Sequence, residues 1–286
     1  MQDAGRFVAC ILVSAAVMLG TPSAGAAQDC FPGPASNEAR TLALFAVSLA
    51  FSRGSAPDVY PGIKAGVELT YLPRVSDEKA TPTICRPGKG PEHANLLIGM
   101  ARPRLTLPLP FGLQLQASWV PPVRVNGVKA NLVGVSIEKV FGHLDGIVAS
   151  VRGHATFGSI HAPVTCDDAR LSDPASECYG GTRSDDRISP NILGVELAVG
   201  GSMDAGRLRP YGGAGYNRLQ PRFQVNFTNR FGEVDRRRVE VDLNRLVVFG
   251  GATWQVAGRM DMSGEIYAAP ADAMTGRVIM RMGVGP

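Results

Sequence analysis

Charged side chains recur at every second residue in several segments of this sequence, and they are its strongest chemical signal. In the last segment Arg277, Ile279 and Arg281 alternate with Val278 and Met280. Successive side chains of a β-strand point to opposite faces, so this pattern predicts a strand with one charged face and one apolar face. Thirteen charged residues fall on the polar faces of such segments: Lys64, Glu68, Arg102, Arg104, Glu138, Arg152, Glu196, Arg218, Arg222, Asp261, Glu265, Arg277 and Arg281.

The chemistry expected of this set is the pairing of opposite charges. Eight of the thirteen residues are basic and five are acidic. A charge enclosed without a partner is costly, so side chains that meet in a narrow lumen should form interlocked ion pairs. We expect the network to fill and seal that lumen. A narrow, slightly anion-preferring channel or a solute site is the alternative.

Four histidines could supply a catalytic base, and one has a suitable neighbour. They are His93, His143, His154 and His161. His154 and Thr156 lie on one face of a predicted strand, where a base and a nucleophile could meet. Threonine is a poor nucleophile for this arrangement, and enclosed histidines are commonly only hydrogen-bonded. We therefore expect no enzymatic activity; a surface enzyme acting on lipid or peptide is the alternative.

Cysteine usage indicates an oxidising compartment. Cys10 belongs to the N-terminal export signal, which leaves four cysteines in the mature chain. An even number in an exported protein favours disulfides, and four cysteines allow three connectivities. The economical pairing joins Cys166 to Cys178 across one polar loop and Cys30 to Cys85, with free buried thiols as the alternative. No CxxC motif or neighbouring histidine pair is present, so we expect neither a metal nor another cofactor.

The export signal is a predicted signal peptide over residues 1–27. A positive charge at Arg6 precedes an apolar run over residues 7–19 and a zone of small residues, so we expect cleavage after Ala26 or Ala27. The apolar run is too short for a transmembrane helix.

The composition excludes several classes of protein. The chain has 286 residues and a net charge of +4, with its basic residues scattered rather than clustered, so we expect no nucleic-acid partner. A mean hydropathy of +0.04 is too low for a helical membrane protein. The 34 glycines and 21 prolines suit a β protein with many turns and loops.

Ten segments with period-two alternation follow one another along the chain. Aromatic residues such as Tyr71, Trp119, Tyr211 and Trp254 fall near segment ends, as they do at membrane interfaces. The segments are Gly62–Leu72, Leu96–Leu107, Gly112–Val120, Val125–Lys139, Gly146–Phe157, Asn191–Gly201, Leu208–Phe227, Arg237–Gln255, Met260–Tyr267 and a last segment around 277–284.

A lead-in over residues 28–61 precedes the first strand, and we expect it on the periplasmic side. Asn37 could cap a short helix over residues 38–51, whose apolar face would need burial. This helix could plug a barrel or pack on its periplasmic mouth. The same residues could instead form an extra strand, although the pattern favours the helix.

The connections between the ten segments alternate in length. Short turns near residues 108–110, 142–144, 204–206 and 257–259 alternate with longer loops. Short periplasmic turns and longer extracellular loops are typical of outer-membrane β-barrels. We predict an all-β, antiparallel, up-and-down transmembrane barrel over residues 62–286, with ten strands, or eight as the alternative. A soluble periplasmic β protein is the competing fold, in which the apolar faces would turn inward.

One segment also resembles a known family. Residues Leu208–Tyr216 read LRPYGGAGY and are similar to the RPYxGxGxG strand of small outer-membrane β-barrel proteins, the superfamily of outer-membrane proteins A and W. The resemblance implies a bacterial outer-membrane protein that contacts outer-membrane lipid, is folded by the barrel assembly machinery and acts as a monomer. Its expected role is structural, at the cell surface or as a narrow channel. Such barrels usually end on an aromatic residue, whereas this sequence ends on Pro286.

Overall fold

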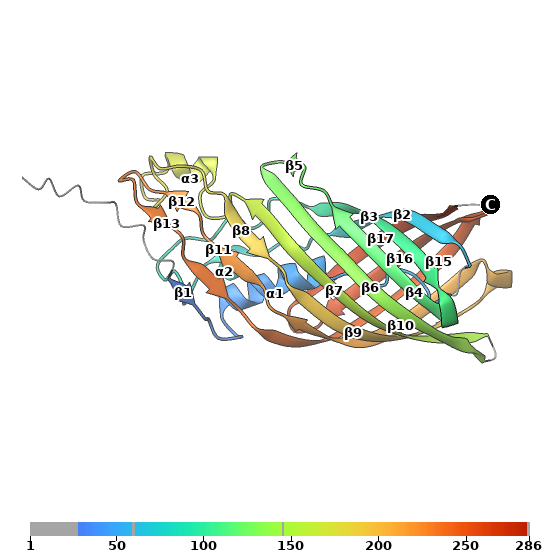
Figure 1. Cartoon of the computed structure of the whole chain (residues 1–286). Helices are drawn as coiled ribbons and strands as arrows, with labels where there is room; N and C mark the ends of the chain where they lie inside the picture. Colours follow the sequence, from blue (N-terminus) through green and yellow to red (C-terminus); the bar gives the residue numbers. More distant parts are fainter. Residues whose placement is uncertain (1–27, 59–60, 145, 285–286) are drawn as a thin grey trace, which may run out of the picture.

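Ten antiparallel strands close a barrel in the computed structural model, which describes residues 28–58, 61–144 and 146–284 (Figure 1). The predicted signal peptide lies outside the described residues. Each barrel strand pairs with the next, and β17 pairs with β2 to complete the ring. The ten-strand prediction is confirmed. The strands are β2 Ile63–Tyr71, β3 Gly99–Leu109, β4 Leu113–Val120, β6 Val128–Leu144, β7 Ile147–Ala162, β9 Ile192–Gly201, β10 Leu208–Leu219, β15 Leu243–Ala257, β16 Met260–Ala269 and β17 Ala273–Val284.

The apolar face of the strands points outward and the charged face points into the lumen. On β17, Met280 and Met282 are more than half exposed, whereas Arg277 and Ile279 are at most 2% exposed. On β9 the same contrast separates the exposed leucines and valines from the buried Glu196. An outward apolar band around a polar interior is the arrangement of a membrane-spanning barrel and the reverse of a water-soluble one.

The two ends of the barrel differ in the length of their connections. At one end, here the turn end, the strands are joined by short turns that include η1 Pro110–Gly112 and η2 Asp204–Gly206. At the opposite end, here the loop end, the connections after β2, β7 and β10 are much longer. By the usual arrangement of outer-membrane barrels, the turn end is periplasmic and the loop end is extracellular.

Short strands continue the wall beyond the barrel at the loop end, and we call β8, β11, β14 and β1 the extension. The first part of β7 pairs with β9, and its last residues pair with β8 instead. From there the sheet continues in the order β8–β11–β14–β1. The predicted strand Arg237–Gln255 is divided in two at residues 241–242, so that β15 stays in the barrel ring and β14 pairs with β11. The extra elements are β1 Asp29–Cys30, α2 Asp77–Ala80, β5 Arg124–Val125, α3 Asp168–Ser172, β8 Asp186–Ser189, β11 Arg222–Gln224, β12 Phe227–Thr228, β13 Val234–Asp235 and β14 Arg238–Glu240.

The N-terminal segment lies inside the barrel, which is the plug position given above as an alternative, and not at the periplasmic mouth. Helix α1, Asn37–Leu49, enters from the loop end (Figure 1), and buried residues 50–57 continue toward the turn end, where β2 begins. The helix is capped by Ser36, whose Oγ accepts the Ala39 N–H at 3.2 Å, and not by Asn37 as predicted. No helix in the described part of the chain is long and apolar enough to cross a membrane.

The reason for this position is an apolar zone on the inner wall. Near the loop end the inward side chains are no longer charged, and they form one buried cluster with the apolar face of α1, including Val47. The helix thus buries the face that the sequence pattern left without a partner. The wall side chains in this zone are Leu219, Val247, Phe249, Tyr267 and Ala269.

Candidate functional site: the plugged lumen

The lumen below the apolar zone is filled by charged side chains and by the N-terminal segment. We call residues 37–58 the plug. Within the described residues, seven buried basic side chains and five buried carboxylates line or enter this part of the lumen. The basic ones are Arg53, Lys64, Arg102, Arg104, Arg152, Arg277 and Arg281, and the acidic ones are Glu68, Glu138, Glu196, Asp261 and Glu265.

Glu68 is the centre of the first group. It is fully buried on β2, directly opposite Arg102 on β3 in the register of the sheet. Its carboxylate lies 3.1 Å from Arg102 Nε and 2.5 Å from Arg104 Nη2. Thr70 donates a further hydrogen bond to it at 2.5 Å, and Arg277 Nε lies 3.9 Å away. One carboxylate therefore faces three arginines.

A second group crosses the wall from β6 to β9. The register places Glu138, Arg152 and Glu196 in one row on three neighbouring strands. Arg152 Nη1 donates to Glu196 Oε2 at 2.9 Å. Glu138 pairs instead with Arg53 of the plug, which also donates to Ser150 Oγ at 2.9 Å. The plug thus contributes a cation of its own to the network.

Glu265 on β16 joins the plug to the wall. Its Oε2 accepts the backbone N–H of Gly54 at 3.0 Å and the hydroxyl of Tyr211 at 3.1 Å. Its Oε1 lies 3.7 Å from Arg277 Nη1. The inward position of Tyr211 corrects the prediction that it belongs to an interfacial ring, because its hydroxyl has a buried carboxylate as partner.

The third group closes the turn end. Asp261 lies 2.9 Å from Lys64 Nζ and 2.7 Å from Arg281 Nε. Arg281 also donates to Ser55 Oγ of the plug at 2.6 Å. Asp58, the last described residue of the plug, pairs with Arg209 on β10 and lies 3.9 Å from Lys64. The turn-end part of the plug is therefore bonded to the wall.

The C-terminal end of α1 is capped by wall arginines. The last carbonyls of a helix have no partner within the helix and carry the negative end of its dipole. Helix α1 has no basic residue in its last turn. Instead Arg277 Nη2 donates to the carbonyl oxygens of Val47 and Ser48 at 3.3 and 3.2 Å, and Arg102 Nη1 donates to that of Leu49 at 3.4 Å.

The same role extends to the backbone after the helix. Arg104 donates to the carbonyl oxygens of Ser52 and Arg53 at 2.7 and 3.0 Å, and Arg152 donates to that of Ser52 at 3.1 Å. The guanidinium groups of Arg104 and Arg152 also lie 4.3 and 5.1 Å from the ring centre of Phe51. The basic side chains outnumber the acidic ones, and backbone carbonyl oxygens of the plug accept hydrogen bonds from them. These carbonyl partners cannot be found by sorting the side chains by charge.

Two of the predicted lumen residues lie elsewhere. Arg218 is exposed on the outer face of β10, and Asn217 takes the inward position. Arg222 lies on the extension, where it pairs with Glu240 at 3.1 Å and Asp242 at 2.9 Å. The prediction was wrong because both residues lie near or above the loop end, where an outward side chain meets water and can be charged.

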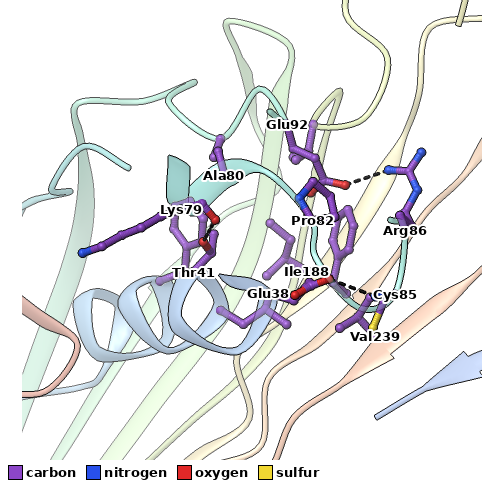
Figure 2. A pocket seen from close by; sticks show the side chains of 15 residues that line it. Glu38, Thr41, Lys79, Ala80, Pro82, Cys85, Arg86, Glu92, Ile188 and Val239 are labelled. Carbon is purple, nitrogen blue, oxygen red and sulfur yellow. Dashed lines mark hydrogen bonds and ion pairs between the residues drawn. The ribbon is translucent and has the colours of Figure 1, made fainter. Parts of the chain in front are cut away.

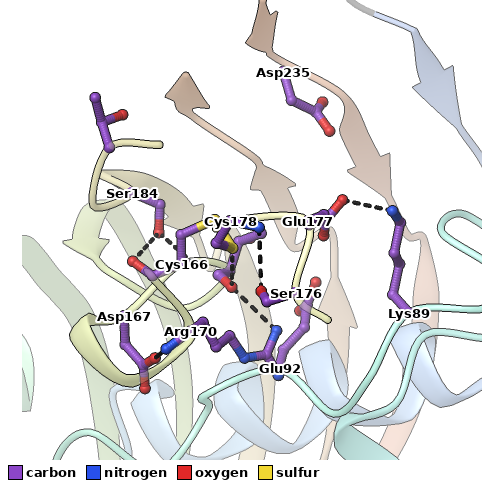
Figure 3. The surroundings of a disulfide bond; sticks show 12 residues. Lys89, Glu92, Cys166, Asp167, Arg170, Ser176, Glu177, Cys178, Ser184 and Asp235 are labelled. Carbon is purple, nitrogen blue, oxygen red and sulfur yellow. Dashed lines mark hydrogen bonds and ion pairs between the residues drawn. A yellow bond between two sulfur atoms is a disulfide. The ribbon is translucent and has the colours of Figure 1, made fainter. Parts of the chain in front are cut away.

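The loop end is braced by two disulfides. Cys30 is bonded to Cys85 and Cys166 to Cys178, the pairing expected as the economical one. Figure 3 shows the second bond within a short polar loop. The first bond joins the chain just before the plug to the loop after β2, so the plug is covalently held at both ends.

Glu38 ties the first turn of α1 to the same loop. Its carboxylate accepts the backbone N–H groups of Thr83, Ile84 and Cys85 at 2.7 to 2.9 Å (Figure 2). Burial works to raise the pKa of Glu38, but the hydrogen bonds from Cys85 and Ile84 outweigh it and hold the pKa below its usual value.

A buried cation lies between two loops beside this contact. Arg86 is 2% exposed and lies 2.7 Å from Glu92; it also pairs with Glu177 of the disulfide loop. Lys89 adds a contact to Glu177 at 2.7 Å (Figure 3). Burial raises the pKa of Glu92 to about 7, although the charge of Arg86 opposes this effect.

The space between α1 and the extension is a small apolar pocket (Figure 2). Its volume is about 40 Å³, enough for a few water molecules. Ile188, Phe223 and Val239 from the extension face Leu42 and Phe45 of the helix across it. The pocket is too small and too well covered to define a ligand.

The one histidine considered for catalysis is part of the packed lumen. His154 is 3% exposed and its Nε2 lies 3.4 Å from Glu196 Oε1. Thr156 is 1% exposed. Among the described residues no group of three or more histidine, cysteine, aspartate or glutamate side chains is arranged to hold a metal ion.

Comparison with known proteins gives only structural likenesses. No protein-family model and no curated protein matches the chain. Among solved structures it is similar to Ail, the attachment invasion locus protein of Yersinia pestis, with 9% identity over 78% of this chain and 98% of that chain and a TM-score of 0.30. It is also similar to a loop-deletion mutant of OmpT, an outer-membrane protein of Vibrio cholerae (12% identity, 64% and 53%, TM-score 0.25), and to a mutant porin of Rhodopseudomonas blastica (12% identity, 78% and 99%, TM-score 0.21). These values describe a likeness of fold alone.

Proposed function

We propose that this outer-membrane β-barrel protein is permanently sealed by its own N-terminal plug and acts through its extracellular end. The observation that carries the proposal is the capping of the plug backbone by four buried wall arginines. Hydrogen bonds from charged groups contribute about 1.5–3 kcal/mol each. Displacing the plug would remove several of them at once and leave the arginines buried without partners.

The covalent connections of the plug support a seal rather than a gate. Cys30 is bonded to Cys85 before the plug, and β2 follows directly after it. A gate needs a segment that can leave the lumen, whereas this segment is tethered at both ends. Because a sealed lumen cannot conduct, we propose a structural or surface role for the loop end.

We propose a monomer that is surrounded by outer-membrane lipid and folded by the barrel assembly machinery. We also propose that it has no catalytic activity, because the enclosed positions of His154 and Thr156 leave no room for a substrate beside them. The purified protein should turn over neither lipid nor peptide, and a turnover that is lost in a His154→Ala variant would overturn this expectation.

The test is conductance in planar lipid bilayers. The wild-type protein should give no conductance steps, with or without a reductant. In a matched variant, residues 37–58 are replaced by a flexible Gly/Ser linker of equal length, and folding is verified by heat-modifiable migration on a gel. This variant should conduct and prefer anions, because its wall keeps six basic and five acidic buried groups. Steady conductance by the wild type would overturn the seal and favour the narrow channel.

A further inference from the structure

A row of basic side chains crosses the outer face of the barrel wall just beyond the apolar band. The register of the sheet aligns Lys129, His161, Arg187, Gln224 and Arg238 on the five neighbouring strands β6, β7, β8, β11 and β14. We call these five residues the basic row. The residues that follow or precede them along the strands, including Ile188, Phe223 and Val239, are buried, so the row shares the outward face.

Neither arginine of the basic row forms an ion pair, although the register places Asp29 of β1 beside Arg238. Across residues 28–58, 61–144 and 146–284, no side chain forms an ion pair or hydrogen bond with the guanidinium group of Arg187 or Arg238. Both arginines are exposed and flank Gln224, one strand to either side. Other arginines of the loop end are paired, for example Arg237 with Asp235 at 2.9 Å. An anion placed between Arg187 and Arg238 would give both guanidinium groups a charged partner.

The surface between these arginines is hollow. A depression of about 190 Å³ is lined by Arg187, Ser189, Arg222, Phe223, Gln224, Arg238 and Glu240. Arg222 is already engaged by Glu240 and Asp242, which holds it in place beside the two unpaired arginines. Guanidinium groups bind phosphate oxygens through two parallel hydrogen bonds, and the amide of Gln224 and the hydroxyl of Ser189 can add further donors.

The height of the hollow above the membrane identifies the source of the anion. On β7 the outward residues run from Phe157, which is 46% exposed, through Ser159 to His161 of the basic row. Two such steps along a tilted strand raise the row by about 10 Å above this aromatic residue. Aromatic side chains mark the boundary of the hydrocarbon region, and the polar headgroups lie beyond it. The hollow therefore faces the headgroup layer of the outer leaflet.

We propose that the hollow between Arg187, Arg222 and Arg238 binds a phosphate group of a phosphorylated glycolipid in the outer leaflet. The site would fix the lateral and vertical position of the extension in the membrane. The site is independent of the plug, because its side chains face outward, on the opposite side of the wall from α1. A conducting wild-type protein would thus leave this proposal standing.

The experiment measures binding to vesicles with and without lipopolysaccharide, the phosphorylated glycolipid of Gram-negative outer leaflets. The Arg187→Gln/Arg238→Gln double variant should bind lipopolysaccharide vesicles at least about tenfold more weakly than the wild type, which corresponds to the loss of one charged hydrogen bond. The control double variant Arg230→Gln/Arg236→Gln has the same change of charge on the loop that carries β12 and β13, and should bind like the wild type. Binding should weaken with salt.

Two further arms separate the possible sources of phosphate. Chemically dephosphorylated lipopolysaccharide should not bind, and inorganic phosphate should compete only at concentrations far above that of the lipid. Equal weakening in both double variants, or binding that survives dephosphorylation, would overturn the site. If inorganic phosphate binds as tightly as the lipid, the site serves a soluble anion and the lipid assignment is wrong.

Discussion

Arg277 shows how one buried side chain can serve two kinds of partner. Its guanidinium group caps two carbonyls of α1, lies near Glu68 and Glu265, and stacks over Tyr267 at 4.8 Å. It therefore contacts the plug and its two neighbouring strands, β2 and β16, at the same time. A residue with this set of contacts contributes to stability mainly because its removal leaves several buried groups without partners.

The first prediction compares Arg277 with a residue of the same type. Arg277→Met should lower the free energy of unfolding by about 3–5 kcal/mol, because it leaves carboxylates and helix carbonyls buried without their cation. Arg222→Met is the control, since Arg222 forms its ion pairs in a half-exposed position and should cost less than about 1 kcal/mol. Denaturant unfolding of the protein folded in detergent measures both. Equal losses would mean that Arg222 also belongs to the buried network.

The second prediction concerns Glu92 at the loop end. Burial raises its pKa from 4.5 to about 7, so the protonated side chain is the one that the folded protein favours. A group with a raised pKa contributes stability that is fully present below about pH 4.5 and is lost as the pH rises through 7. The midpoint temperature of thermal unfolding should therefore decrease as the pH is raised from about 5 to about 8. The decrease corresponds to at most about 3 kcal/mol in the free energy of unfolding.

The control for this pH dependence is Glu92→Gln, which fixes the side chain in a neutral form. The variant should lose the part of the pH dependence that Glu92 supplies. An identical fall of the midpoint in wild type and variant would exclude Glu92 as its source.

At the scale of elements, the strands could be predicted from the sequence because their cause is local. Alternation such as that of Leu193, Val195 and Leu197 fixes both the strand and its faces, and the loop lengths fix the strand order. The sequence left the position of α1 open between the lumen and the periplasmic mouth, since the choice depends on an apolar zone formed by wall residues far apart in the sequence. The lumen pairs of Glu68 and Asp261 followed from strand parity, but the carbonyl partners of the arginines depend on the plug.

The third prediction tests how closely the plug fits the wall. Gly54 has a φ of +67°, and a Cβ added to it would overlap with Ile279 Cδ1 on β17. Gly54→Ala should therefore destabilise the protein by about 2 kcal/mol or more, through backbone strain and overpacking together. Gly276→Ala is the control, because a Cβ there meets nothing within 4 Å on the outer face of the same strand. Heat-modifiable migration at rising temperature compares the two, and a Gly54→Ala variant as stable as the control would mean that the plug is loosely held.

At the scale of the whole molecule, the plug sets the topology of the chain. The exported chain begins in the periplasm, yet Gln28 and β1 lie at the loop end and β2 begins at the turn end. In the folded protein the N-terminal segment lies along the lumen inside the ring that β17 and β2 close, and the Cys30–Cys85 disulfide tethers it there.

The last prediction follows from this topology. A short epitope tag inserted between Gln28 and Asp29, after the predicted cleavage site, should be detected by antibody on intact cells, because β1 pairs with β14 on the extracellular extension. The same tag inserted after Ala205, in the turn between β9 and β10, should be detected only after the outer membrane is permeabilised. Both tagged proteins should retain heat-modifiable migration, which shows that the barrel is folded. A tag at Asp29 that is hidden on intact cells would place the N-terminus in the periplasm, where the sequence alone predicted it, and would exclude the plug as it lies in this structure.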